Sequence, residues 1–114
     1  MPRYEKIADT VLRERVATAH DQIRSGKPSE AVRTLSDAFV DLIDRHPGVR
    51  QQSTLVRGRP FPLIARWPAL GASLVLGPEG DGPARIEFAR ERFAVSEALT
   101  YFEFVVDLAL GQGL

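Results

Sequence analysis

Apolar residues return every three or four positions along the first 46 residues of the chain. Within residues 4–23 they fall on one face of a helix, and charged residues occupy the other face. Gly26 then supplies a left-handed stop, which predicts a helix over about 4–25. A second amphipathic pattern over 28–46 begins with proline, which suits a first helical turn. Because the connection is so short, we expect these two helices to form an antiparallel hairpin.

The middle of the chain carries shorter apolar runs that are broken by proline and glycine. Residues 47–60 are polar and basic, which predicts a long connection, with a short edge strand in TLVR at 54–57. GPEGDGP at 77–83 is a cluster of turn-forming residues. Three runs of apolar or alternating residues begin within 61–90, and we expect them to form an antiparallel meander over that range: 63–65, 73–76 and 84–91.

The last apolar pattern covers residues 94–110 and predicts a helix that Ser96 can cap. Its polar residues are confined to a narrow stripe that includes Glu97, Glu103 and Asp107. A helix that is apolar over most of its circumference has to be covered on more than one side. We therefore expect this helix to be enclosed by other elements or by a second molecule.

These elements predict a single α+β domain over 1–114 with the order α-α-β-β-β-α. Its parts are the N-terminal antiparallel αα-hairpin, the basic connection, the three-stranded antiparallel β-meander and the C-terminal helix, at 4–46, 47–60, 61–90 and 94–110. A sheet this small has one face for the helices and one face left over. Together with the apolar last helix, that face predicts a symmetric homodimer.

Charge and composition exclude several classes of function. Fifteen basic and fifteen acidic residues cancel, so no overall field attracts nucleic acid or an anionic membrane. The chain has no cysteine, and therefore no disulfide, thiolate nucleophile or cysteine-bound zinc. The first ten residues are charged where a signal peptide needs an apolar run, so we expect a cytoplasmic protein. Basic residues that are nearly all arginine, with no asparagine, are typical of a GC-rich bacterial genome.

Residues with catalytic or metal-binding chemistry do not gather in the sequence. His20 and His46 would lie ~18 Å apart along the helical hairpin, too far to share a metal. Ser73 lacks the rest of a nucleophile elbow, and the glycines of 77–83 precede a strand rather than a helix. We therefore expect no catalytic residue, no metal and no cofactor.

Three hypotheses of function follow. The first is a non-enzymatic protein-interaction or regulatory module whose partner is a second copy or another protein. The second is a small-molecule-binding domain, with or without enzymatic activity, whose cavity lies between the sheet and the C-terminal helix. The residues that line this cavity are Trp67, Tyr101, Phe104 and Phe88. Arg66 or Glu103 supplies the polar contact to the ligand. The third is a nucleic-acid binder that uses a basic patch in 50–59: Arg50, Arg57 and Arg59. The zero net charge disfavours the third.

Overall fold

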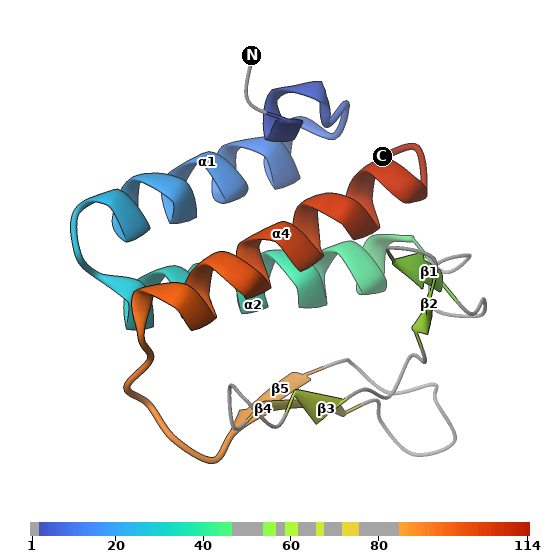
Figure 1. The fold of residues 1–114 in the computed structure, drawn as a ribbon. Helices are drawn as coiled ribbons and strands as arrows, with labels where there is room; N and C mark the ends of the chain where they lie inside the picture. Colours follow the sequence, from blue (N-terminus) through green and yellow to red (C-terminus); the bar gives the residue numbers. More distant parts are fainter. Residues whose placement is uncertain (1–2, 47–53, 57–58, 62–65, 68–71, 76–84) are drawn as a thin grey trace.

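The computed structural model describes residues 3–46, 54–56, 59–61, 66–67, 72–75 and 85–114. The elements follow one another along the chain as shown in Figure 1. They are the 3-10 turn η1 (Arg3–Lys6), helices α1 (Thr10–Arg24) and α2 (Pro28–Arg45), strands β1 (Thr54–Val56), β2 (Arg59–Phe61), β3 (Arg66–Trp67), β4 (Ala72–Val75) and β5 (Arg85–Phe88), and helix α4 (Val95–Gly111).

The N-terminal helical hairpin is confirmed, but its first helix begins later than the apolar pattern predicts. Asp9 caps α1 by accepting a hydrogen bond from the backbone N–H of Leu12 at 3.0 Å, and residues 3–6 form the separate turn η1. The hairpin turn contains Gly26, whose φ of 75° is the left-handed conformation that glycine adopts without strain. Helix α2 then packs back along α1.

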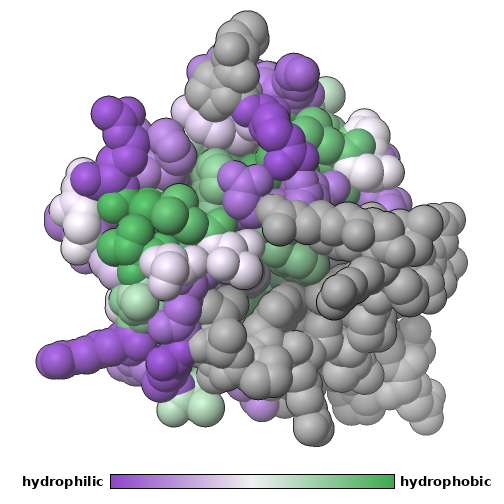
Figure 2. Space-filling model, viewed as in Figure 1, coloured by the Kyte–Doolittle hydropathy of each residue, from purple (hydrophilic) through white to green (hydrophobic). Residues whose placement is uncertain are grey.

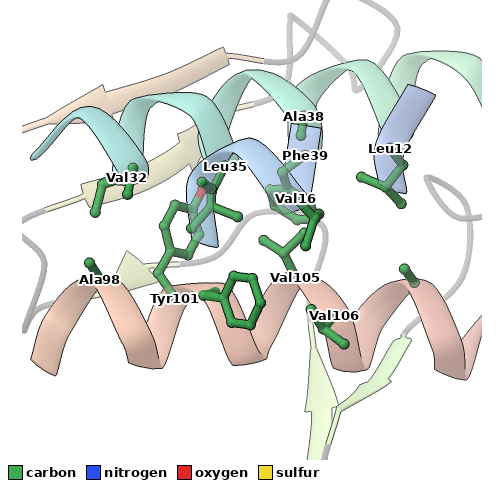
Figure 3. Close-up of a cluster of buried hydrophobic side chains, with 14 of the residues drawn as sticks. Leu12, Val16, Val32, Leu35, Ala38, Phe39, Ala98, Tyr101, Val105 and Val106 are labelled. Atoms are coloured by element: carbon green, nitrogen blue, oxygen red, sulfur yellow. The ribbon is translucent and has the colours of Figure 1, made fainter. Parts of the chain in front are cut away.

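Helix α4 lies across both helices of the hairpin (Figure 1). Leu12 and Val16 from α1, Leu35 and Phe39 from α2, and Val105 from α4 are among the fully buried side chains (Figure 3). Burying one such large side chain contributes roughly 1.5–3 kcal/mol. Strand β1 also packs against α4. The apolar circumference of α4 is therefore covered mainly by its own chain.

The predicted α+β fold class is wrong. The described part of the chain is mostly helical, and three α-helices form its core. All of the buried apolar side chains that the structure describes come from these helices, apart from Ile7 and Phe93. Within the described residues, strands β3, β4 and β5 pair in a short three-stranded ladder, and none of its described side chains is fully buried in the core. The apolar stripes of the helices pack against one another instead.

The strands are pieces of two to four residues that lie beside the helices. Strands β1 and β2 pair antiparallel, with Leu55 opposite Pro60. Strand β1 coincides with the short edge strand predicted at 54–57, and β2 extends past the predicted end of the basic connection at residue 60. Strand β4 pairs antiparallel with both β3 and β5, with Ser73 opposite Arg66 and Glu87. The predicted strand at 63–65 and the turn at 77–83 lie outside the described residues. The described strands have at most four residues each, so they cannot bury an apolar face comparable to those of the helices.

Hydrogen bonds hold the start of α4 and the segment that follows its end. Its N-cap is Ala94 rather than the predicted Ser96, and the Glu97 carboxylate accepts a hydrogen bond from the Ala94 N–H at 3.3 Å. At the other end, the carbonyl of Leu114 accepts a bond from the N–H of Ala8 at 2.8 Å. This bond joins the C-terminus to the segment that precedes α1. Within the described residues, none of the helices has both the length and the apolar character required to cross a membrane.

Two carboxylates of the predicted acidic stripe of α4 are paired with the N-terminal turn, and the third, Glu97, is paired with Arg90. Arg3 donates to Glu103 at 3.0 Å and also binds Asp107. One guanidinium therefore bridges two carboxylates that are one helical turn apart. This bridge holds η1 against α4.

Replacing Leu35 by Ala tests the helical core. Leu35 is fully buried, and we expect the variant to lose about 2–5 kcal/mol of unfolding free energy because the cavity cannot close completely. Chemical denaturation followed by circular dichroism measures this loss. Val11, which is 46% exposed on α1, provides the matched control, since Val11→Ala should change stability by less than about 0.5 kcal/mol. Equal effects of the two substitutions would contradict the described core.

Replacing Asp9 by Asn tests the charge cluster at the start of α1. Asp9 accepts bonds from Arg45 at 2.7 Å and lies 3.4 Å from the ring of His46. The bond from Arg45, followed by the one from the Leu12 N–H, holds the pKa of Asp9 far below its ordinary value. The stabilisation is therefore complete above pH ~4 and is lost as the pH falls towards the pKa of the folded state.

Asn keeps the capping oxygen and removes only the charge. We expect Asp9→Asn to cost about 1 kcal/mol at neutral pH, a value reduced by the partial exposure of Arg45. Thermal unfolding across pH should show the difference from wild type shrinking below pH ~4. Glu14→Gln, at an exposed carboxylate of α1, serves as the control. A difference for Asp9→Asn that stays constant down to pH ~2 would refute the assignment.

Candidate binding cleft between helix α2 and strand β5

A cleft of about 610 Å³ lies between α2 and β5. Residues of α2 at three- and four-residue spacing share one helical face, and this face forms one wall. Strand β5 alternates, so Ile86 and Phe88 share one face while Glu87 is exposed on the other. Both Ile86 and Phe88 line the cleft. The two periodicities therefore bring an apolar strand face against a mixed helix face.

The floor of the cleft is apolar. Val40, Ile86 and Phe88 are partly buried and pack against the hydrophobic core. The Phe88 ring packs edge-on against Phe93, with centroids 5.7 Å apart, and the guanidinium of Arg33 lies 5.6 Å from its centroid. These contacts fix the Phe88 ring, so the floor is a packed surface rather than a set of loose side chains.

Three carboxylates follow the α2 wall at positions 37, 41 and 44. At 1.5 Å rise per residue they span ~10 Å along the helix. Asp41 accepts a bond from Arg45 at 2.7 Å, and Arg45 also binds Asp9. Asp37 is exposed and has no ion pair within the residues that the structure describes. Asp44 is exposed as well. The wall is therefore acidic.

The one cation among the described lining residues is already engaged. Arg33 pairs with Glu91 at 3.0 Å while it lies over the Phe88 ring. It is the first of the α2 lining residues along the chain, and its pair with Glu91 joins α2 to the segment between β5 and α4. Its charge is thus largely balanced without a ligand.

A buried hydrogen bond supports the cleft from below. Ser36 lines the cleft, is 3% exposed, and donates to the Val32 carbonyl at 2.7 Å. Its oxygen lies 3.0 Å from the hydroxyl of Tyr101, which is left to act as the donor. Burial raises the pKa of Tyr101, so the phenol stays protonated and can donate. The bond joins the middle of α2 to the middle of α4.

The structure separates the residues that the sequence predicts for a ligand cavity. Tyr101 and Phe104 stack 6.3 Å apart and Phe104 meets Phe39 edge-on, so this pair belongs to the packing between α2 and α4. Phe88 alone of the aromatic candidates with described side chains lines the cleft. Glu103 is paired with Arg3. Of the remaining candidates, Arg66 and Trp67 form β3, and Arg59 lies in β2. Arg50 and Arg57 lie outside the described residues.

The α2 residues that line this cleft were not among the candidates predicted from the sequence. The signal was present, because Asp37, Asp41 and Asp44 recur at spacings of four and three on one helical face beside Val40. Charged residues on a helix face are usually solvated, so the pattern alone did not distinguish a cleft wall from a surface. The position of β5 beside α2 distinguishes the two cases, because Ile86 and Phe88 line the cleft together with this helix face.

The two histidines serve packing and pairing. The His20 ring packs against Tyr4 and Phe102, with centroid distances of 5.4 Å to each, and those two rings also contact each other at 6.0 Å. His46 lies beside Asp9. Across the part of the chain that is described, no group of three or more His, Cys, Asp and Glu residues is arranged to hold a metal.

Comparison of the chain with protein-family models, curated proteins and solved structures finds no match in any of the three. The fold and the cleft therefore have to be interpreted from the residues of this chain.

Proposed function

We propose that this chain is a non-enzymatic protein-interaction module that binds a segment of a partner protein in the cleft between α2 and β5. One observation carries the proposal: an apolar floor of Val40, Ile86 and Phe88 is flanked by a charged rim. Protein interfaces combine an apolar centre with a polar, solvent-accessible edge in this way.

The exposure of the rim favours a polypeptide over a small molecule. Small-molecule sites bury most of their ligand within enclosing walls. Here Arg33, Asp37 and Asp44 are exposed at the edge of the cleft. A chain segment can cover such an open surface with its own side chains, whereas a small ligand would remain largely in water.

The hydroxyl groups beside the cleft support binding rather than reaction. Ser36 donates to a backbone carbonyl, and Tyr101 occupies its oxygen. A nucleophilic serine needs a base within hydrogen-bonding distance to take its proton. The bonds made by Ser36 instead serve to align two helices.

A random-peptide phage selection against the wild-type protein tests the cleft. We expect the enriched peptides to lose at least tenfold in affinity for Val40→Gln, because the substitution places an amide on the apolar floor. Val11→Gln is the matched control, since Val11 is an exposed valine on another helix, and it should bind as wild type. Circular dichroism confirms that both variants fold.

Hydrogen exchange of the wild-type protein gives a second readout that needs no variant. A bound peptide should slow amide exchange in 36–44 and 86–88 and leave α1 unchanged. Peptides that bind Val40→Gln and Val11→Gln equally, with protection elsewhere, would refute the cleft as the binding site. Failure to enrich any peptide would count against the proposed function itself.

Self-association stays a prediction. The exposed apolar residues of α4 are the surface on which we base it. Figure 2 shows hydrophobic side chains exposed on the side where α4 lies in Figure 1. Val95 and Leu99, one helical turn apart on α4, are 44% and 42% exposed. We propose that a second copy covers this α4 face.

Light scattering over a range of protein concentrations measures the association. We expect a dimer for the wild type and a monomer for Leu99→Lys, because an unpaired charge is costly inside an interface. Val11→Lys should behave as wild type. A wild-type protein that stays monomeric at every concentration would contradict the homodimer.

A further inference from the structure

We infer that the cleft between α2 and β5 selects a basic amphipathic segment, one that presents Arg or Lys to Asp37 and an adjacent apolar side chain to Val40 and Ile86. The inference rests on the proposed function and specifies the chemistry of the partner. It follows from how the charges around the cleft are already paired.

The cations near the cleft are engaged with other groups. Arg33 binds Glu91 and covers the Phe88 ring, and Arg45 binds both Asp41 and Asp9. Asp37 has no such pair among the described residues, and its side chain is exposed. The wall therefore presents a carboxylate to whatever occupies the cleft. A cation of the partner would be attracted and an anion repelled.

The spacing of Asp37 and Val40 defines the pattern that the partner needs. These residues lie three apart on α2, so they occupy the same face. A helical segment with a cation and an apolar residue three or four positions apart presents both groups at a similar separation. Arg fits a carboxylate better than Lys, because its planar guanidinium can donate two parallel hydrogen bonds.

Binding of this kind would not be a general effect of charge. The chain carries equal numbers of basic and acidic residues, so it has no net field that attracts cations. The attraction arises from the local arrangement: Arg33 and Arg45 are paired with carboxylates, and Arg15 donates to the backbone carbonyl of Asp37 rather than to its carboxylate. Removing the single carboxylate of Asp37 should therefore weaken the binding of a basic segment.

Two synthetic helical peptides test the inference directly. One places Leu and Arg at three- and four-residue spacing, and the other has Glu in place of every Arg. Fluorescence anisotropy with the full chain should show the Arg peptide binding at least tenfold more tightly. Asp37→Asn should weaken the Arg peptide about three- to tenfold, and Asp37→Lys should weaken it further. Raising the salt concentration should weaken it as well.

Glu14→Gln is the matched control, since it removes an exposed carboxylate from α1, outside the cleft lining. Equal affinities of the Glu14→Gln and Asp37→Asn variants for the Arg peptide, or equal affinities of the two peptides for the wild type, would overturn the inference. Loss of the phage-selected peptides with Val40→Gln but not with Asp37→Asn would leave the proposed function standing and remove the charge preference. If the Arg peptide binds Val40→Gln as tightly as the wild type and protects amides elsewhere, the cleft is refuted as the binding site.

Discussion

The need to cover helix α4 organises the described part of this protein. Its buried residues spread over ~160° of the helix circumference at 100° per residue, from Leu108 on one side to Val106 on the other. Packing against one neighbour would leave part of this surface in water. The chain meets the requirement by laying α4 across α1 and α2 and by packing β1 against it. The hairpin and the β1–β2 pair can each be understood as parts of this enclosure.

One buried polar contact gives this enclosure a defined register. The bond between Ser36 and Tyr101 is satisfied only when those two positions of α2 and α4 lie opposite each other. Apolar contacts alone would tolerate small shifts of one helix along another. A buried hydroxyl left without its partner costs about 1–3 kcal/mol, so such shifts are penalised. The same contact lies under the candidate cleft, and thus the packing of the core also sets the position of its α2 wall.

Helix α2 has two distinct roles on two faces. Leu35 and Phe39 enter the core, whereas Asp37, Val40 and Asp41 line the cleft towards β5. The apolar floor of the cleft continues directly into the core, because Val40, Ile86 and Phe88 pack against it. The floor is therefore continuous with the core, while the carboxylates of the rim remain in contact with solvent. This combination of an apolar surface and an accessible charged edge is what makes the cleft suitable for a protein segment.

Local sequence determined the helices. The three-to-four-residue spacing, the proline at the start of α2 and the glycine of the hairpin turn all act within a few residues, so their effects can be recognised without the fold. One helix start and one cap were misjudged where side chains decide the matter: Asp9 rather than an earlier residue precedes α1, and Glu97 secures a cap at Ala94 instead of Ser96. Only the tertiary structure decided what the apolar faces pack against. The helices pack on one another, so the expected sheet layer is replaced by short strand pieces, and Tyr101 becomes a core residue instead of a ligand contact. The cleft likewise depends on α2 and β5 coming together across more than forty residues of chain, a contact that no local pattern encodes.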